Sequence, residues 1–104
     1  MASALFFHQL AALLKAGIPM QQSLGMAGKG CSQGLQRSLR ETSFKLAAGA
    51  DLASSLDQQF FDAWTIHLLR SAEYSGSLVE TCERLATNLE AQRQRRRLYR
   101  SVNT

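Results

Sequence analysis

The sequence predicts an all-α fold, namely a six-helix bundle built of antiparallel helix pairs with a long C-terminal helix. The chain has 104 residues with only one proline and seven glycines, too few turn residues for a β-sandwich. Helix-forming residues dominate, and apolar residues recur at helical spacing. Hydrophobic residues make up 45% of the chain, which suits a single domain over residues 1–104 with one modest core.

Two helices are predicted at the start of the chain. The first covers residues 3–16, where Ser3 can cap the first turn and Gly17 ends the helix, because glycine leaves a helix through left-handed dihedrals at little cost. Pro19 suits the first turn of a second helix, over residues 19–27, since that turn needs no amide donor. Their inward faces hold Phe6, Leu10, Leu13 and Leu14, then Met20, Leu24 and Ala27.

The middle of the chain predicts two further helices. Ser32 can cap a third helix, which Gly49 closes. Asp51 can cap a short fourth helix, because its carboxylate can accept a hydrogen bond from an amide of the first turn. The inward positions of these two helices are Leu35, Leu39, Thr42, Leu46, Leu52 and Leu56.

A fifth helix is predicted from about Phe61 to Gly76, where the glycine terminates it. Helical spacing places four side chains on its inward face, with Leu69 alongside. These four are Phe61, Trp64, Leu68 and Ala72. His67 lies next to this face, so it is expected to be a partly buried polar residue.

The sixth helix has the clearest predicted start in the sequence. Ser77 and Glu80 match a capping box, in which the serine bonds the amide of the third helical residue and the glutamate reaches back. No breaker follows, so the helix is predicted to continue to about Val102, a length of roughly 37 Å. The apolar stripe ends at Leu89, and the last turns are therefore expected to project beyond the body.

Positive charge is concentrated at the C-terminal end. Residues 1–89 carry seven basic and seven acidic residues, whereas the remaining residues carry five arginines against Glu90. The arginines are Arg93, Arg95, Arg96, Arg97 and Arg100. Segments beside a membrane span are rich in Lys and Arg and attract anionic lipid, so residues 91–104 are interpreted as a basic juxtamembrane helix end. A solvated helix end and a nucleic-acid contact are the alternatives.

No catalytic, metal-binding or cofactor-binding set of residues is predicted. The chain has two histidines and two cysteines, and their spacing fits no zinc, redox or nucleophilic motif. Glu73, Glu80 and Glu83 surround the expected turn between the last two helices, where a divalent cation remains an open alternative to helix capping. No apolar run reaches the about 20 residues that span a bilayer. These features favour a scaffold over an enzyme.

Two segments resemble the signatures of one family. Residues 6–19, an aromatic and leucine-rich helix followed by Ala-Gly-Ile-Pro, are similar to the opening signature of the type II secretion system protein F domain. Residues 68–78 are similar to the second signature of that family. The positions taken as its fold signature are Gly17, Pro19, Glu73, Gly76, Ser77 and Glu80. Phe61 stands where the family usually has proline, and Ala72 where it usually has glycine, which affects only local packing.

The resemblance implies a non-catalytic cytosolic domain of a polytopic platform protein, on the cytoplasmic face of the bacterial inner membrane. Such a protein scaffolds type II secretion or type IV pilus assembly and couples the cytosolic assembly ATPase to the pseudopilus. Its partners would be that ATPase and other inner-membrane components, with the flanking membrane spans outside this chain. The sequence does not distinguish a secretion system from a pilus system. It also does not distinguish the first from the second cytosolic copy of the domain in the parent protein.

The resemblance also implies a homodimer. The surface of the first helix is the candidate interface, because Leu5, Phe6 and Phe7 follow one another and are not expected all to face one core. The alternative function, from a different class, is a small basic helical regulator that binds nucleic acid. That function requires binding to nucleic acid that weakens strongly as the salt concentration rises, whereas a platform domain is not expected to bind nucleic acid.

Overall fold

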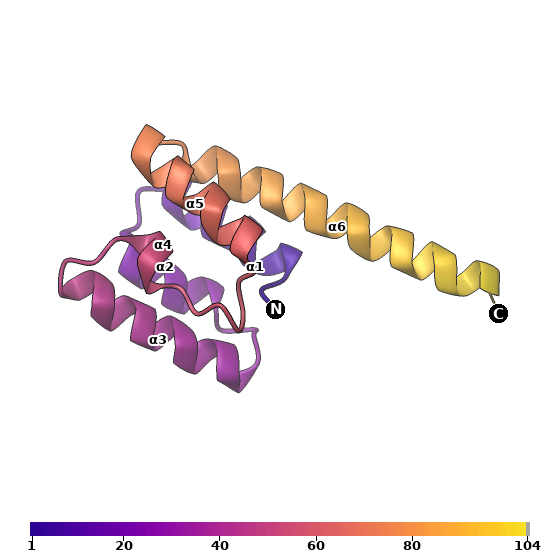
Figure 1. The fold of residues 1–104 in the computed structure, drawn as a ribbon, viewed down its shortest axis with the longest axis horizontal. Coiled ribbons are helices and arrows are strands. Elements are labelled where there is room, and N and C mark those ends of the chain that lie inside the picture. The colour runs from indigo at the N-terminus through magenta and orange to yellow at the C-terminus, as the bar shows by residue number, and fades with distance from the viewer. Residues whose placement is uncertain (104) are drawn as a thin grey trace.

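The computed structural model describes residues 1–103, through which six helices run (Figure 1). Their bounds are α1 (Ala4–Lys15), α2 (Met20–Ala27), α3 (Gln33–Ala47), α4 (Leu52–Ser55), α5 (Ala63–Ser75) and α6 (Leu78–Asn103). No strand occurs in residues 1–103, which confirms the predicted all-α class. Thr104, the last residue of the predicted basic helix end, lies outside the described residues.

The helices form a closed ring in which each packs against the next, and α1 also lies against α6. The predicted pairs α1–α2, α3–α4 and α5–α6 are therefore in contact, but the most extensive contact joins the first and last helices. Figure 1 shows α3 on the opposite side of the body from α6, and the C-terminal part of α6 extends beyond the other helices. This projection accounts for the long axis of a molecule that measures 50 × 29 × 25 Å.

Three phenylalanines form the centre of the core. Phe6 and Phe7 on α1 are 1% and 2% exposed, and Phe61 from the turn before α5 is 2% exposed. Their ring centroids are 5.2 Å apart for Phe6–Phe7, 5.9 Å for Phe6–Phe61 and 6.1 Å for Phe7–Phe61, all edge-to-face. Edge-to-face pairs at this spacing add about 0.5–1.5 kcal/mol each to the stabilisation from apolar burial.

The prediction that Phe6 and Phe7 belong to an interface is wrong. α1 packs on two sides at once, against α2 and α6, so two adjacent positions about 100° apart around the helix both face protein. Of the three predicted interface residues only Leu5 is on the surface, where 60% of it is exposed.

The fifth helix begins later than predicted and buries a different face. The carboxylate of Asp62 caps it, so α5 starts at Ala63 and Phe61 belongs to the preceding turn. The buried residues of α5 are Ile66, Leu69 and Ala72. Trp64, predicted to point inward, is 67% exposed and stacks on His67, which is exposed and not partly buried as predicted. Counting the helical period from Phe61 shifted the predicted face.

Gly17 and Gly76 end α1 and α5 as predicted. Both adopt left-handed dihedrals, with φ of +86° and +73°. After each glycine the next amide donates to the carbonyl five residues back, at 3.1 Å and 2.9 Å, which satisfies a carbonyl that the helix leaves free. Pro19 lies one position outside α2, where its fixed φ of −56° directs the chain into the helix.

Candidate functional site

Glu73 on α5 holds the start of α4. Its two carboxylate oxygens accept hydrogen bonds from the amides of Leu52 at 2.7 Å and Ala53 at 2.9 Å. A helix of four residues has too few internal bonds to be stable alone. Asp51 adds a local cap by accepting from the Ser54 amide, and the hydrogen bond that it accepts from the Ser54 hydroxyl is the main cause that lowers the pKa of Asp51. Glu73 therefore links two helices, and its charge complements the amides at the start of α4.

The predicted capping box at the start of α6 is wrong. The Ser77 hydroxyl lies 2.8 Å from the Ser75 hydroxyl, and within the described residues it does not bond the Glu80 amide. The Glu80 carboxylate is exposed, and it forms no hydrogen bond or ion pair with any residue from 1 to 103. Because only two residues separate α5 from α6, the Ser77 side chain reaches back to the end of α5.

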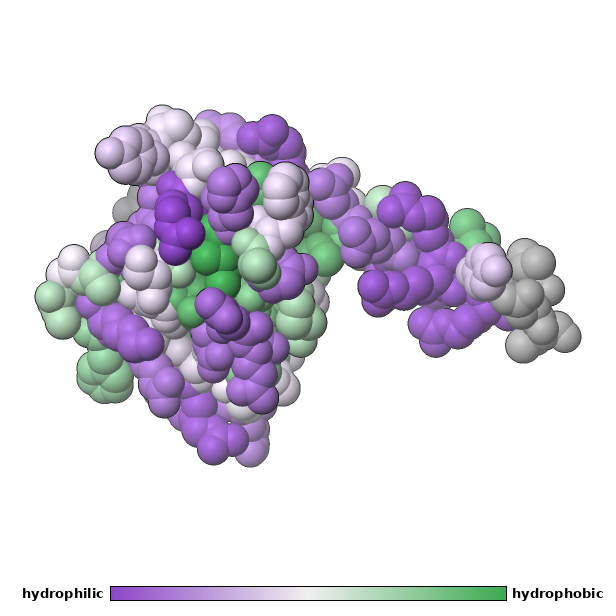
Figure 2. All heavy atoms as spheres, viewed as in Figure 1, coloured by the Kyte–Doolittle hydropathy of each residue, from purple (hydrophilic) through white to green (hydrophobic). Residues whose placement is uncertain are grey.

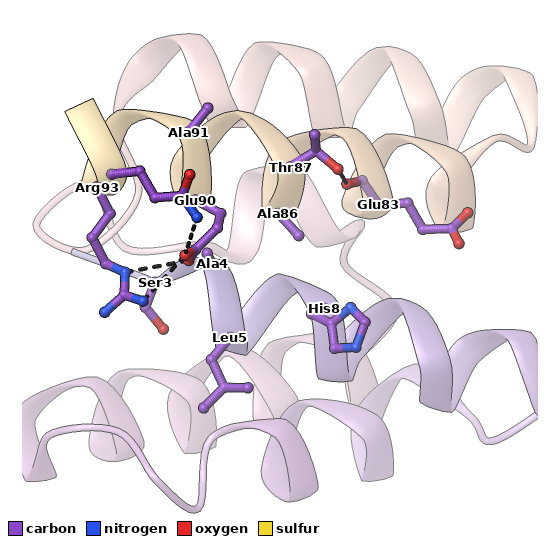
Figure 3. A pocket seen from close by; sticks show the side chains of 11 residues that line it. Ser3, Ala4, Leu5, His8, Glu83, Ala86, Thr87, Glu90, Ala91 and Arg93 are labelled. Carbon is purple, nitrogen blue, oxygen red and sulfur yellow. Dashed lines mark hydrogen bonds and ion pairs between the residues drawn. The ribbon is translucent and has the colours of Figure 1, made fainter.

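An open groove of about 850 Å³ runs between α1 and α6 (Figure 3). The residues that line it are Ser3, Ala4, Leu5, His8, Glu83, Ala86, Thr87, Glu90, Ala91, Arg93 and Gln94. Three of these side chains are alanines, which leave room beside the exposed apolar side chain of Leu5. At one end, Arg93 and Glu90 form an ion pair at 3.1 Å, and this contact lowers the pKa of the Glu90 carboxyl. The groove therefore combines an apolar lining with charged groups.

The end of α6 carries a continuous positive surface. All residues from 92 to 100 are exposed, and Figure 2 shows this part of the molecule as largely hydrophilic. Four arginines follow one another at helical spacing on one side, and Arg95 lies beside them with Tyr99, which is 73% exposed. The four are Arg93, Arg96, Arg97 and Arg100. Among residues 1–103, no helix has the length and apolar character to cross a membrane.

The thiols and imidazoles are dispersed over the molecule. Cys82 is fully buried, and this burial raises the pKa of its thiol to about 12, so the thiol stays protonated and unreactive at neutral pH. Burial also raises the pKa of Cys31. His8 lies in the α1–α6 groove, whereas His67 stacks on Trp64. In the part of the chain that the structure describes, no three His, Cys, Asp or Glu residues group into a possible metal site.

Comparison with known proteins identifies the family. The family model described as type II secretion system (T2SS), protein F, matches residues 6–101. The chain belongs to the type II secretion system protein F family. It is 36% identical over 90 residues to the type IV pilus assembly protein PilC of Pseudomonas aeruginosa, covering 84% of this chain and 24% of that protein. It is 38% identical over 88 residues to the type 4 fimbrial assembly protein PilC of Pseudomonas putida, covering 82% and 22%. The chain thus spans about a quarter of the length of these curated relatives.

The residues that suggested the protein F family lie in two turns and not in one site. Gly17 and Pro19 make the turn between α1 and α2, and the other four surround the turn between α5 and α6. These four are Glu73, Gly76, Ser77 and Glu80. Four of the six act at helix ends. Gly17 and Gly76 end helices, Glu73 holds the start of α4, and Pro19 directs the chain into α2. In this protein F domain the signature therefore specifies helix boundaries.

One exposed surface was not predicted from the sequence. Arg37, Arg40 and Phe44 share one side of α3, and Phe44 is 75% exposed. The charge count over residues 1–89 as a whole concealed this surface, because basic and acidic residues occupy different halves of that range. Counting charge separately for residues 1–50 and 51–89 would have revealed it.

Proposed function

We propose that this chain is a non-catalytic cytosolic domain of an inner-membrane platform protein, which scaffolds type II secretion or type IV pilus assembly. The platform couples the cytosolic assembly ATPase to the pseudopilus. The family match over residues 6–101 carries the proposal, supported by two relatives that are named for pilus or fimbrial assembly. The chain spans about a quarter of those relatives, so the activity of the whole protein is part of the proposal.

Coupling requires a stiff connection between the helical body and the membrane, and α6 has the shape of such a connection. Its 26 residues form one uninterrupted helix, about 39 Å long at 1.5 Å per residue. The N-terminal part packs against α1 and α5, whereas residues 92–100 are exposed. A displacement of the body is thus passed directly to the end of the helix, because no flexible joint separates the two.

A proline in the exposed part of α6 tests this lever. Gln94→Pro removes a backbone hydrogen bond and clashes with the preceding turn, which kinks a helix at a cost of about 3 kcal/mol. In the full-length platform protein, Gln94→Pro is expected to abolish pilus or secretion assembly. Gln94→Ala is the matched control, since it also removes the side-chain bond to Glu90 and keeps the helix. Thermal melts of both variants should show an intact body, and normal assembly with Gln94→Pro would contradict the lever.

The five arginines of residues 93–100 are proposed to lie against the anionic headgroups of the membrane. Each basic residue near such a surface contributes about 1 kcal/mol, so neutralising three should weaken binding about 100-fold. The variant is Arg95→Gln/Arg96→Gln/Arg97→Gln, measured by co-sedimentation with anionic and neutral liposomes. Lys15→Gln/Arg70→Gln/Arg84→Gln is the control with an equal loss of charge. Stronger binding to duplex DNA than to anionic liposomes would favour the nucleic-acid alternative.

The α1–α6 groove is proposed as the surface on which a second copy docks to form a homodimer. Leu5 is the apolar residue that α1 leaves exposed beside this groove. A second copy would cover it and bury the alanines that line the groove, and burial of such a strip drives association. Phe6 and Phe7 contribute indirectly, because they fix α1 in the core.

A further inference from the structure

The body of the molecule is polarised in charge. Residues 1–50 carry five basic residues against Glu41, whereas residues 51–90 carry seven acidic residues against Arg70 and Arg84. The first segment forms α1 to α3, and the second forms α4, α5 and the first half of α6. The five basic residues are Lys15, Lys29, Arg37, Arg40 and Lys45. The net charges of the two segments, +4 (five minus one) and −5 (two minus seven), nearly cancel, but opposite charges lie on different helices.

Most of the acidic residues of the second segment have partners inside the chain. Five of the seven accept hydrogen bonds with their carboxylates: Asp51 from Ser54, Asp57 from Gln59, Asp62 from Thr65, Glu73 from Leu52 and Ala53, and Glu90 from Arg93. Four of these five carboxylates start helices or tighten turns, which is a common structural use of carboxylates. The acidic side of the body is therefore largely explained by the fold itself.

The cations of α3 and of the loop that precedes it have no such structural task. Within the described residues, the side chains of Lys29, Arg37, Arg40 and Lys45 form no hydrogen bond and no ion pair. All four residues are exposed. An external acidic group can therefore pair with these side chains without displacing a partner inside the described part of the chain.

An exposed aromatic side chain lies among these cations. Arg37, Arg40 and Phe44 stand at positions i, i+3 and i+7 of α3, which places them on one face. Phe44 is 75% exposed, and aromatic residues and arginines are enriched in protein interfaces. Glu41 lies on the same face, so the surface is not uniformly positive.

A groove of about 230 Å³ opens beside this face, between α2 and α3. Gly25 and Gly28 give it space, since neither has a side chain, and a Cβ on Gly28 would come within 2.6 Å of the leucine packed against it from α3. The Gln36 side-chain amide donates to the Lys29 carbonyl at 3.2 Å and so holds the connecting loop. Lys29 and Arg40 both line the groove, which is therefore preformed and basic.

We propose that the basic α2–α3 face, made of Lys29, Arg37, Arg40 and Phe44, docks an acidic surface of the assembly ATPase, with Phe44 as the apolar anchor. This inference rests on the proposed function, which supplies the partner, and adds the surface and its chemistry. Complementary charge steers such an encounter, and burial of the ring holds the complex.

A protein is favoured over a membrane for two reasons. Glu41 interrupts the basic α2–α3 face and would be repelled by a sheet of phosphates. In addition, α3 lies across the body from α6, whose basic end is the proposed membrane contact (Figure 1). A partner other than a second copy is favoured because most of the acidic residues of this chain already accept hydrogen bonds within it.

The test titrates the full chain with the purified assembly ATPase at low and high salt. Arg37→Glu/Arg40→Glu is expected to weaken binding at least about tenfold, and Phe44→Ala about tenfold without a change of charge. Arg70→Glu/Arg84→Glu is the matched control, because it changes the net charge equally on the acidic side. All variants alter exposed residues, and circular dichroism melts confirm that each is folded.

The outcomes separate this inference from the function on which it rests. Loss of binding in the two α3 variants alone supports the docking surface. Equal binding by all variants overturns the docking surface and leaves the coupling function standing. No binding of the unaltered chain overturns both. If Arg37→Glu/Arg40→Glu instead abolishes self-association in sedimentation, or binding to anionic vesicles, then a second copy or a membrane is the occupant and the proposal is wrong.

Discussion

Replacing Glu73 with alanine is expected to lower the free energy of unfolding by about 3 kcal/mol. The substitution removes two charge-assisted hydrogen bonds, at 2.7 Å and 2.9 Å, and leaves the amides of Leu52 and Ala53 without their acceptor. Both residues are only 2% exposed, so water does not easily take the place of the carboxylate. Urea unfolding at neutral pH, followed by circular dichroism, measures the loss.

Glu80→Ala provides the control for Glu73→Ala. Glu80 is also a glutamate beside the α5–α6 turn, but it is exposed and bonds nothing within the described residues. Its replacement is expected to change stability by less than about 0.5 kcal/mol. Glu73→Gln keeps one acceptor oxygen, so its loss of unfolding free energy should lie between those of Glu73→Ala and Glu80→Ala. Similar losses of unfolding free energy for Glu73→Ala and Glu80→Ala would show that the contact of Glu73 with α4 does not stabilise the domain.

Replacing Phe7 with alanine is expected to cost about 3–5 kcal/mol, the usual range for an aromatic side chain in a core. Phe7 is 2% exposed and contacts the rings of Phe6 and Phe61, so the substitution opens a cavity where three elements meet. Small domains have about 5–15 kcal/mol of stability in total, and the variant should therefore melt at a much lower temperature. Calorimetry gives the shift directly.

Leu5→Lys separates the contribution of this part of α1 to the stability of the monomer from its contribution to the homodimer. Leu5 is 60% exposed, so its replacement should leave the free energy of unfolding of the monomer almost unchanged. Because it lies beside the α1–α6 groove, the added charge should instead weaken the homodimer, which sedimentation equilibrium measures. An undisturbed dimer in Leu5→Lys would exclude this surface as the interface.

Helix boundaries were the most predictable part of this fold. Ser3, Ser32 and Asp51 cap helices as predicted, by accepting hydrogen bonds from amides three residues ahead. Gly17 and Gly76 likewise end helices through their own backbone dihedrals. Each of these features depends on chemistry within one turn, which is fully visible in the sequence.

The errors arose where a second element competes for a side chain. Ser77 had the correct spacing for a capping box, yet its hydroxyl bonds Ser75 across a two-residue turn. Trp64 had the correct spacing for the core, but the Asp62 cap moved the start of α5 and left the ring outside. Spacing alone does not reveal which of two nearby partners a group will choose.

By itself, then, the sequence determined the helical class, the six elements, most of their ends and the family, because local hydrogen bonding and helical period act over a few residues. Only the tertiary structure decided which faces are buried and which are free. The contact of α1 with α6 joins the two ends of the chain and buries Phe6 and Phe7, and the reach of Glu73 to α4 spans about twenty residues. Such contacts depend on where distant helices meet in space, and only the structure shows that Phe44 is exposed beside the arginines of α3.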